Sequence, residues 1–238
     1  MGETQKTPHK KLYLQVYDDI CKYIASNNLK PGDHLPTEME MCQKLGVSRT
    51  ILREAIKSLE ITGVIRSRPG IGIIIQSFST DRFFSCLIDS MYISGDDHLE
   101  DDVEQMRKVI ELGFSAQAFD TLSQEDISKI ESILNDMKHA AEVQIRSKSK
   151  IFGLSFAEAD ARFHQTIFSK IPNKLVLSII NFFWAYDRKF KIKQPSSRHL
   201  RITLDKHEKI YNALMEHDKK MFMEAMEYHY SYDYKEKS

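Results

Sequence analysis

Apolar residues recur at helical spacing in the first part of the chain. Leu12, Val16, Ile20 and Ile24 follow one another at four-residue steps, which predicts an amphipathic first helix. The segment LKPGDHLP then interrupts the pattern, because its two prolines and its glycine favour a turn. The sequence therefore predicts one helix and a turn before the next helical segment.

Two shorter helices are predicted in the segment that follows. Thr37 can cap the first of them, with Glu40 three residues later as its capping-box partner, and this helix ends at Gly46. Ser48 is placed to cap the second helix. That helix runs to Gly63, a residue that tolerates the left-handed backbone at a helix end.

Beyond this point the pattern changes to VIRSRPGIGIIIQ, which is rich in β-branched residues. Pro69 and Gly70 suit the centre of a type II turn, whose third position requires a positive φ. The flanking valine and isoleucines suit two short strands. Three helices followed by a two-stranded hairpin predict a winged helix-turn-helix.

From Thr80 onward the periodicity is helical. Turn-forming residues divide this part into six or seven helices of ordinary length, which predicts a single antiparallel all-α bundle. The predicted fold is mainly α, with a winged helix-turn-helix over residues 1–77 and the helical domain over residues 78–238. The expected breaks lie near residues 94–96, 121–123, 151–153, 171–172, 194–197 and 217–219.

Composition narrows the class of protein. Hydrophobic residues make up 42% of the chain, which suffices for a core, and no apolar run approaches the ~20 residues of a membrane span. The N-terminus lacks the apolar stretch of a signal peptide, so we expect a cytoplasmic protein with no membrane partner. The three cysteines are widely separated and odd in number, which favours reduced, mostly buried thiols over disulfides or a zinc ribbon.

The net charge is zero, but it is distributed unevenly. Residues 1–77 hold 11 Lys and Arg against 8 Asp and Glu, whereas the remainder holds 23 against 26. A mildly basic N-terminal part joined to a mildly acidic partner domain agrees with a small DNA-binding unit.

The third predicted helix carries a row of cations. Arg49, Arg53 and Lys57 are spaced four apart, so they share one face, and a recognition helix places such residues on base edges. A solvated helix face would explain the row by itself, but the preceding helix, the tight turn and the wing together favour DNA binding. The candidate DNA-binding residues are Ser48, Arg49, Thr50, Arg53, Arg68 and Gly70.

The segment PGDHLPTEMEMCQKLGVSRTILREAIKSLEITGVIRSRPGIG resembles the N-terminal domain of GntR-family bacterial transcription regulators. The resemblance covers roughly residues 10–76 and implies double-stranded operator DNA as the partner. It also implies that Arg49, Thr50 and Arg53 contact operator bases or phosphates. Met39 stands where the family usually has an arginine that contacts DNA, so the usual family operator is not assumed for this chain.

Four possible metal ligands occur in the C-terminal part. Asp160 and His164 are four residues apart and share a helix face, and His207 and His229 each lie 11 residues from Asp218. If the chain turns back at Asp218, the two imidazoles face one another across a helical hairpin. One carboxylate and three imidazoles can bind a divalent metal with open positions for a ligand. The alternatives are a surface hydrogen bond between Asp160 and His164 and no role for the other histidines.

From about residue 80 to residue 232 the chain is similar to the FCD ligand-binding domain of the FadR subfamily of GntR regulators. The resemblance places Asp160, His164, His207 and His229 in the order and spacing of the metal-binding members. It implies a divalent metal ion (zinc first, with nickel, iron or manganese as alternatives) and a small effector, in several members a carboxylate. Arg107 then corresponds to an arginine that helps to hold the carboxylate. The alternative for Arg107 is a helix-surface pair with Glu111.

The sequence thus predicts a DNA-binding transcription regulator, acting as a homodimer, whose operator affinity depends on a small effector bound near the metal. A metal-dependent enzyme that uses the Asp/His/His/His site is the first alternative, and a regulator with a purely structural metal is the second. We assign no catalytic residues, because the sequence has no recognisable nucleophile–base pair, phosphate-binding loop or general base beside the ligands.

Overall fold

The computed structural model describes residues 11–77, 79–96, 98–147, 155–190 and 195–231. The chain forms two compact units, Met1–Leu87 and Ile88–Ser238, and each is described here by itself. The boundary between the two units falls within one helix, later in the chain than the domain boundary predicted after residue 77.

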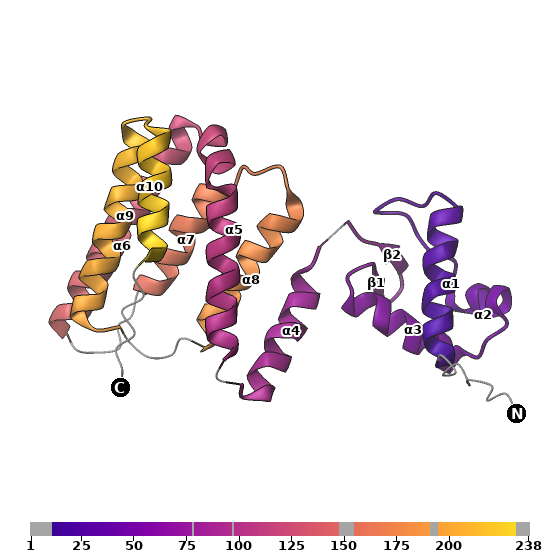
Figure 1. Ribbon diagram of the computed structural model, residues 1–238. Coiled ribbons are helices and arrows are strands. Elements are labelled where there is room, and N and C mark those ends of the chain that lie inside the picture. Colours follow the sequence, from indigo (N-terminus) through magenta and orange to yellow (C-terminus); the bar gives the residue numbers. More distant parts are fainter. Residues whose placement is uncertain (1–10, 78, 97, 148–154, 191–194, 232–238) are drawn as a thin grey trace, which may run out of the picture. The chain divides into compact units, whose positions relative to one another are not determined.

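Within its described residues, the N-terminal unit contains three helices and a two-stranded hairpin, followed by the first part of a fourth helix (Figure 1). Its elements are α1 (Leu12–Ser26), α2 (Glu38–Leu45), α3 (Arg49–Ile61), β1 (Ile65–Arg68) and β2 (Gly72–Ile75). Helix α3 is the centre of the unit, because α1, α2 and β1 all pack against it. The arrangement confirms the predicted winged helix-turn-helix. Its buried core contains Val16, Ile20, Leu35, Met41, Leu52, Ala55, Ile56, Leu59, Ile65, Ile73 and Ile75.

The predicted caps fix where α2 and α3 begin. The Thr37 hydroxyl accepts from the Glu40 backbone N–H, and the Glu40 carboxylate accepts from the Thr37 backbone N–H at 2.8 Å. Gly46 ends α2 with a φ of 65°, and the Ser48 hydroxyl then accepts from the Ile51 N–H at the start of α3. Each cap satisfies backbone groups that have no partner inside the helix.

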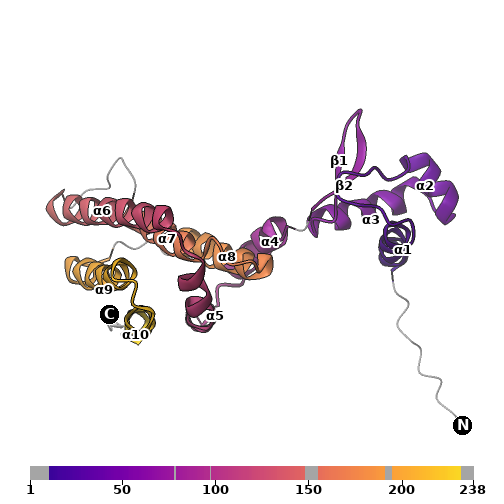
Figure 2. The ribbon, with the colours of Figure 1, turned by 90° about the horizontal axis from the view of Figure 1, so that it is seen from above.

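The C-terminal unit is a bundle of helices, and helix α4 leads into it (Figures 1 and 2). Helix α6 packs against α7 and α9, α9 against α10, and α5 against α8 and α10. Their apolar faces enclose one core, which includes the fully buried rings of Phe163, Phe168 and Phe222. The predicted all-α bundle is confirmed. The helices are α4 (Asp81–Ser94), α5 (Leu99–Thr121), α6 (Gln124–Ser147), α7 (Phe156–Phe168), α8 (Lys174–Phe190), α9 (Ser197–Met215) and α10 (Lys219–Ser231).

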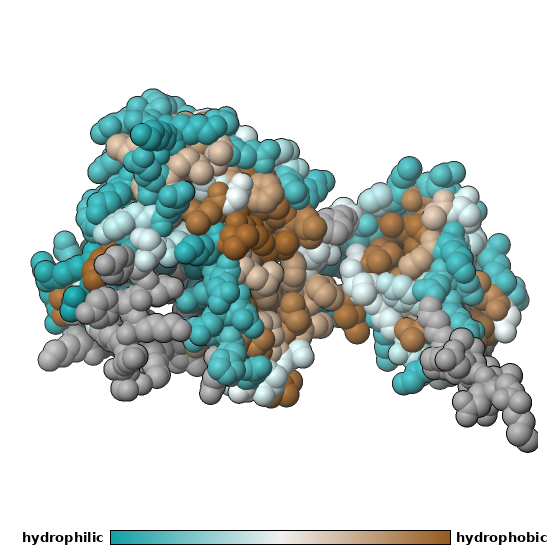
Figure 3. All heavy atoms as spheres, viewed as in Figure 1, coloured by the Kyte–Doolittle hydropathy of each residue, from teal (hydrophilic) through white to brown (hydrophobic). Residues whose placement is uncertain are grey.

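The surface of the C-terminal unit is uneven in polarity. In Figure 3 hydrophilic residues dominate over α9 and α10, whereas apolar residues gather over α5 and α8. Met106, Val109 and Leu175 are among the large apolar side chains that these two helices expose. Within the described residues, no helix combines the length and the apolar composition needed to cross a membrane.

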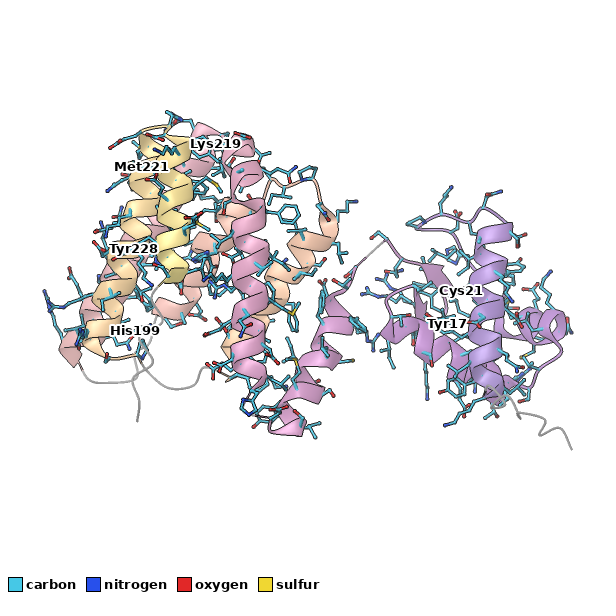
Figure 4. All side chains as sticks on the ribbon, in the orientation of Figure 1. Tyr17, Cys21, His199, Lys219, Met221 and Tyr228 are labelled. Atoms are coloured by element: carbon cyan, nitrogen blue, oxygen red, sulfur yellow. The ribbon has the colours of Figure 1, made fainter. Side chains whose placement is uncertain are left out.

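The expectation of mostly buried thiols was wrong. Cys21 and Cys42 are half-buried and Cys86 is exposed, and all three are free. On α1, Cys21 follows Tyr17 by one turn (Figure 4), while Val16 and Ile20 occupy the buried centre of the helix face. Cys21 therefore lies at the edge of the apolar face, where burial is incomplete.

Candidate functional site

The exposed face of α3 carries the cations predicted to contact DNA. Arg49, Arg53 and Lys57 are exposed one turn apart, whereas Leu52 and Ala55 are fully buried in the core. Burial of one helix face leaves the opposite, cationic face available to a partner. The other candidate residues, Ser48, Thr50, Arg68 and Gly70, are exposed as well.

The wing ends in a tight turn. The Ile71 N–H donates to the Arg68 carbonyl at 3.1 Å, and Gly70 has a φ of 75°, as a type II turn requires. A Cβ atom added at Gly70 would have nothing within 4 Å. The tip of the wing therefore offers unhindered backbone beside the exposed Arg68.

Arg53 is held by a neighbouring helix. Its Nε donates to Glu38 Oε2 at 3.0 Å and to Oε1 at 3.2 Å, and its Nη2 lies 2.9 Å from Glu38 Oε2. Sequence reasoning missed Glu38, because the contact joins residues 15 positions apart on two helices. Met39, the next residue of α2, is 57% exposed at the position where the family resemblance predicts an arginine.

Three imidazoles from α7, α9 and α10 converge inside the C-terminal unit. One ring nitrogen each of His164, His207 and His229 lies within 4.8 Å of the others. The rings of His207 and His229 are 4.8 Å apart between centroids, as their equal distances from Asp218 predict. Beside them, Asp160 Oδ1 lies 2.8 Å from His207 Nε2 and 3.6 Å from His164 Nε2.

Hydrogen bonds at the outer ring nitrogens decide which atoms face the centre. The Nδ1 of His207 lies 2.7 Å from the Thr203 carbonyl, which can only accept, so this Nδ1 carries a hydrogen. The Nδ1 of His164 lies 2.7 Å from the Glu111 carboxylate, which is ionised and also only accepts. A ring that carries its hydrogen on Nδ1 can direct the lone pair of its Nε2 inward. The two Nε2 atoms face each other at 3.2 Å.

The centre thus gathers electron pairs that need a cation. The buried Nδ1 of His229 has no hydrogen-bond partner among the described residues, so this atom is available to bind a cation as well. Burial lowers the pKa of His164 and holds the pKa of His229 well below its usual value, so both rings are neutral near pH 7. Burial alone would raise the pKa of Asp160, but His207 and then His164 lower it, so this carboxylate is ionised.

The spacing of these atoms agrees with a metal site. Nitrogen ligands lie about 2.1 Å from zinc, so neighbouring ligands in a tetrahedral or octahedral site are about 3.0 to 3.4 Å apart. The 3.2 Å between the Nε2 atoms of His164 and His207, and the 2.8 Å from His207 to Asp160, are close to this spacing. Because imidazole and carboxylate are common ligands of divalent metals, the residues present fit such an ion.

Arg107, on α5, belongs to a buried network beside this centre. Its Nε donates to Glu111 at 3.1 Å, its Nη1 donates to Asp187 at 3.3 Å, and its guanidinium carbon lies 3.6 Å from the centre of the Trp184 ring. The Tyr230 hydroxyl donates to Glu111 at 2.6 Å. The Arg107–Glu111 pair expected as an alternative does form, but not on the surface, because the two side chains are 11% and 0% exposed.

Glu111 connects the two groups of residues. Burial by itself would raise its pKa, but the interaction with His164, the charge of Arg107 and the hydrogen bond from Tyr230 lower it to about 2. One carboxylate therefore holds the ring of His164 and the guanidinium of Arg107 at the same time. A change at Arg107 can reach the imidazole centre through this single side chain.

The C-terminal end of α8, where Asp187 lies, contacts α4. Lys189 forms an ion pair with Asp89, and its ammonium lies 5.1 Å from the centre of the Tyr92 ring. The rings of Tyr92 and Phe190 are 5.7 Å apart between centroids. Because α4 runs from the N-terminal unit into the C-terminal unit, the helix that carries Asp187 contacts the connecting helix.

The structure thus brings together Asp160, His164, His207 and His229, with Arg107 nearby. Sequence reasoning missed Asp187 and Tyr230, which lie 80 and 119 positions from their partners on α5. The position of Tyr230 directly after His229 was the only local signal for its role. Nothing in the sequence around Asp187 indicates its contact with Arg107.

Two known protein families match separate parts of the chain. Residues 12–75 match the family described as bacterial regulatory proteins, gntR family, and residues 102–232 match the FCD domain. The HTH-type transcriptional regulator YcbG of Bacillus subtilis (strain 168) is 30% identical over 209 residues, which cover 88% of this chain and 82% of that protein.

Two Escherichia coli (strain K12) regulators are also similar. The Exu regulon transcriptional regulator is 27% identical over 89% of this chain and 79% of its own length. The galactonate operon transcriptional repressor is 23% identical over 84% of this chain and 85% of its own length. Among solved structures, Streptococcus agalactiae GntR has the same fold, with a TM-score of 0.56, 21% identity and coverage of 92% of this chain and 96% of that one.

Proposed function

Since the chain belongs to the gntR family of bacterial regulatory proteins, in its FadR-like subfamily with an FCD domain, it is a DNA-binding transcription regulator, and we propose that a small carboxylate bound beside a divalent metal controls its operator affinity. In this proposal a homodimer places two copies of α3 in successive major grooves of operator DNA. The proposed DNA contacts come from the start of α3 and from the wing: Ser48, Arg49, Thr50, Arg53, Arg68 and Gly70.

The proposed metal ligands are Asp160, His164, His207 and His229. The observation that carries this proposal is the convergence of three ring nitrogens and a carboxylate oxygen in a buried centre, where the Nδ1 of His229 has no hydrogen-bond partner among the described residues. When bound, a divalent ion supplies positive charge and open coordination positions for an anionic ligand. Zinc is the first candidate, because imidazole is one of its usual ligands, and nickel, iron and manganese are the alternatives.

The proposed effector is a small carboxylate that binds Arg107. A guanidinium binds carboxylates through paired N–H groups, and this one is already in contact with two of them. Glu111 also binds the ring of His164, whereas Asp187 lies 3.3 Å from Nη1 of Arg107 and comes from a different helix, so in this proposal an effector carboxylate takes the place of Asp187 on the guanidinium. The similar repressor of Escherichia coli is named for a galactonate operon, and galactonate is an organic carboxylate, which supports this class.

The proposed route from effector to DNA runs through α8 and α4. Replacement of Asp187 on Arg107 changes the end of α8, where Lys189 and Phe190 contact α4. Effector and operator binding are then coupled to the extent that the effector prefers one arrangement of the helices.

Metal analysis of ligand variants tests the metal site. Full-length wild type, His164→Ala and His207→Ala are loaded with Zn²⁺, dialysed against metal-free buffer and analysed by mass spectrometry of the elements. The matched control is His139→Ala, which removes an exposed histidine of α6. We expect about one ion per chain in wild type and control and a small fraction of that in both ligand variants. Full metal content in both ligand variants would overturn the assignment.

DNA binding tests the effector. The probe is a duplex that the wild type selects from a randomised pool, and fluorescence anisotropy measures its affinity in a panel of small carboxylates that includes galactonate. We expect one or more of these acids to change the dissociation constant by about 5- to 150-fold, and Arg107→Gln to abolish the change. If metal binds but no acid changes the affinity, the metal is structural and the effector proposal is wrong.

A further inference from the structure

The cations on the exposed face of α3 are not equivalent. Arg53 forms an ion pair with Glu38 of α2, whereas within the described part of the chain Arg49 and Lys57 form none. The pair is accessible, since the side chains of Arg53 and Glu38 are 61% and 35% exposed. An exposed pair of this kind contributes little to the free energy of unfolding. We therefore consider how it orients the side chain of Arg53.

The contacts of Glu38 occupy one side of the guanidinium. A guanidinium has a fork of N–H groups at its side, formed by Nε and one terminal nitrogen, and a second fork at its end, formed by both terminal nitrogens. The carboxylate of Glu38 accepts from Nε and lies 2.9 Å from Nη2, which is the side fork. The end fork of Nη1 and Nη2 has no other partner among the described residues, and it remains free.

Glu38 is itself rigidly placed. It is the first residue of α2, directly after Thr37, and the capping box between Thr37 and Glu40 fixes this turn of the helix. The backbone of Arg53 is fixed as well, because its neighbour Leu52 is fully buried in the core of the unit. Glu38 and Arg53 therefore bridge two fixed helices, and the ion pair restricts the rotation of a side chain that would otherwise be mobile.

A free end fork suits one kind of base. Guanine presents its O6 and N7 side by side in the major groove, and an arginine can donate to both at once. We propose that Glu38 is a positioning residue that orients Arg53 so that its end fork reads one guanine of the operator. The inference rests on the DNA-reading role proposed for α3 and adds to it a G·C pair and the residue that enforces its recognition.

The negative charge of Glu38 allows a positioning role to be distinguished from a structural role by experiment. A carboxylate near the phosphates weakens binding to any DNA sequence, so removing its charge strengthens non-specific binding. Loss of the positioning contact weakens only the preference for guanine. Glu38→Gln therefore changes the two quantities in opposite directions, whereas a merely structural role of Glu38 would reduce both together.

The experiment uses full-length protein and three kinds of DNA. These are the duplex that the wild type selects from a randomised pool, its single-base-pair variants, and a scrambled duplex of equal length. With Glu38→Gln we expect the preference at one G·C pair to fall about tenfold, while affinity for the scrambled duplex is unchanged or up to about threefold higher. Glu38→Asp, whose carboxylate reaches less far, should lose part of the preference.

Two further variants test whether Glu38 acts through its ion pair with Arg53. Glu54→Gln removes the same charge from the exposed surface of α3 and should keep the preference for guanine, because among the described residues the ion pair of Arg53 is with Glu38 and not with Glu54. In an Arg53→Ala background, Glu38→Gln should cause no further loss at that base pair, because a positioning residue acts only through the residue that it positions.

Two results would overturn the inference while leaving DNA binding intact. One is a wild-type preference profile in Glu38→Gln, and the other is a stronger preference for guanine, which would mean that Glu38 withholds Arg53 from DNA. If the wild type selects no sequence from the pool, both this inference and the DNA-reading role of α3 are wrong.

Discussion

Replacing Glu111 by glutamine should strongly destabilise the C-terminal unit. The carboxylate of Glu111 is fully buried and accepts hydrogen bonds from Arg107, His164 and Tyr230. A glutamine amide has nearly the same shape, but its NH2 group donates and cannot accept from any of these three donors. The variant also leaves Asp187 as the only anion in contact with the buried guanidinium among the described residues.

The size of this loss follows from the charge that Glu111 compensates and from its pKa. Removing one partner of a buried ion pair costs about 3 to 5 kcal/mol, because it leaves an uncompensated charge. The pKa of Glu111 is about 2 in the folded protein. A carboxyl with that pKa, and with about 4.3 in the unfolded chain, contributes about 3 kcal/mol of stability at neutral pH. We therefore expect Glu111→Gln to lower the free energy of unfolding by about 3 to 5 kcal/mol.

Urea unfolding followed by tryptophan fluorescence measures this loss. Trp184 is the single tryptophan of the protein, so its emission reports on the C-terminal unit alone. A chelator in all samples removes the contribution of bound metal. The control is Glu142→Gln, which breaks a pair with Arg146 at the same four-residue spacing, with the side chains 65% and 81% exposed. Such an exposed pair should contribute no more than about 0.5 kcal/mol.

The contribution of Glu111 to stability should decrease as the pH is lowered. Because the folded pKa of Glu111 is below its unfolded value, its contribution is complete well above pH 4.3 and is lost as the pH falls toward about 2. The difference between wild type and Glu111→Gln should therefore shrink in acid, by roughly 0.6 kcal/mol at pH 4. A loss no larger than that of Glu142→Gln at neutral pH would refute the reasoning, since Glu111 would then behave as an exposed helix residue.

Three further predictions concern other parts of the molecule. Ni²⁺ added to chelator-treated protein should quench Trp184, whose ring centre lies 5.3 Å from that of His164, and unchanged emission would argue against metal at the imidazoles. Gly63→Ala should destabilise the N-terminal unit by about 1 to 2 kcal/mol. Its φ is 75° and the new Cβ would lie 2.8 Å from the Ser79 carbonyl oxygen, so hydrogen exchange across residues 12–75 should accelerate, and wild-type exchange would contradict this. Thr37→Ala removes the N-cap of α2 and should cost about 1 kcal/mol, measured as faster exchange within that helix, whereas equal exchange would mean that the cap is dispensable.

The start of α2 and the wing were predictable because their signals act over a few residues. A capping box joins positions three apart, and a type II turn is set by the backbone preferences of Pro69 and Gly70. The same holds for Asp160 and His164, since residues four apart on a helix share a face whatever surrounds the helix. The pairing of His207 with His229 required one further step, the turn of a hairpin near Asp218.

Burial and long-range partners were not predictable in this way. Arg107 and Glu111 have the spacing of an ordinary surface pair, and only the packing of α5 against α8 and α10 buries them and supplies Asp187 and Tyr230. The thiol of Cys21 was misjudged for a related reason, because helical periodicity identifies the apolar face but not how far its edges are covered.

The sequence by itself determined the elements, their caps, the cationic face of α3 and the residue types of the candidate metal centre. These depend on helical periodicity and on backbone preferences, which are properties of short segments. Only the tertiary structure decided that Glu38 holds Arg53, that Glu111 joins His164 to Arg107, and that ring nitrogens from three helices meet in one centre. Those contacts depend on the distances and angles at which separate helices pack, which no short segment encodes.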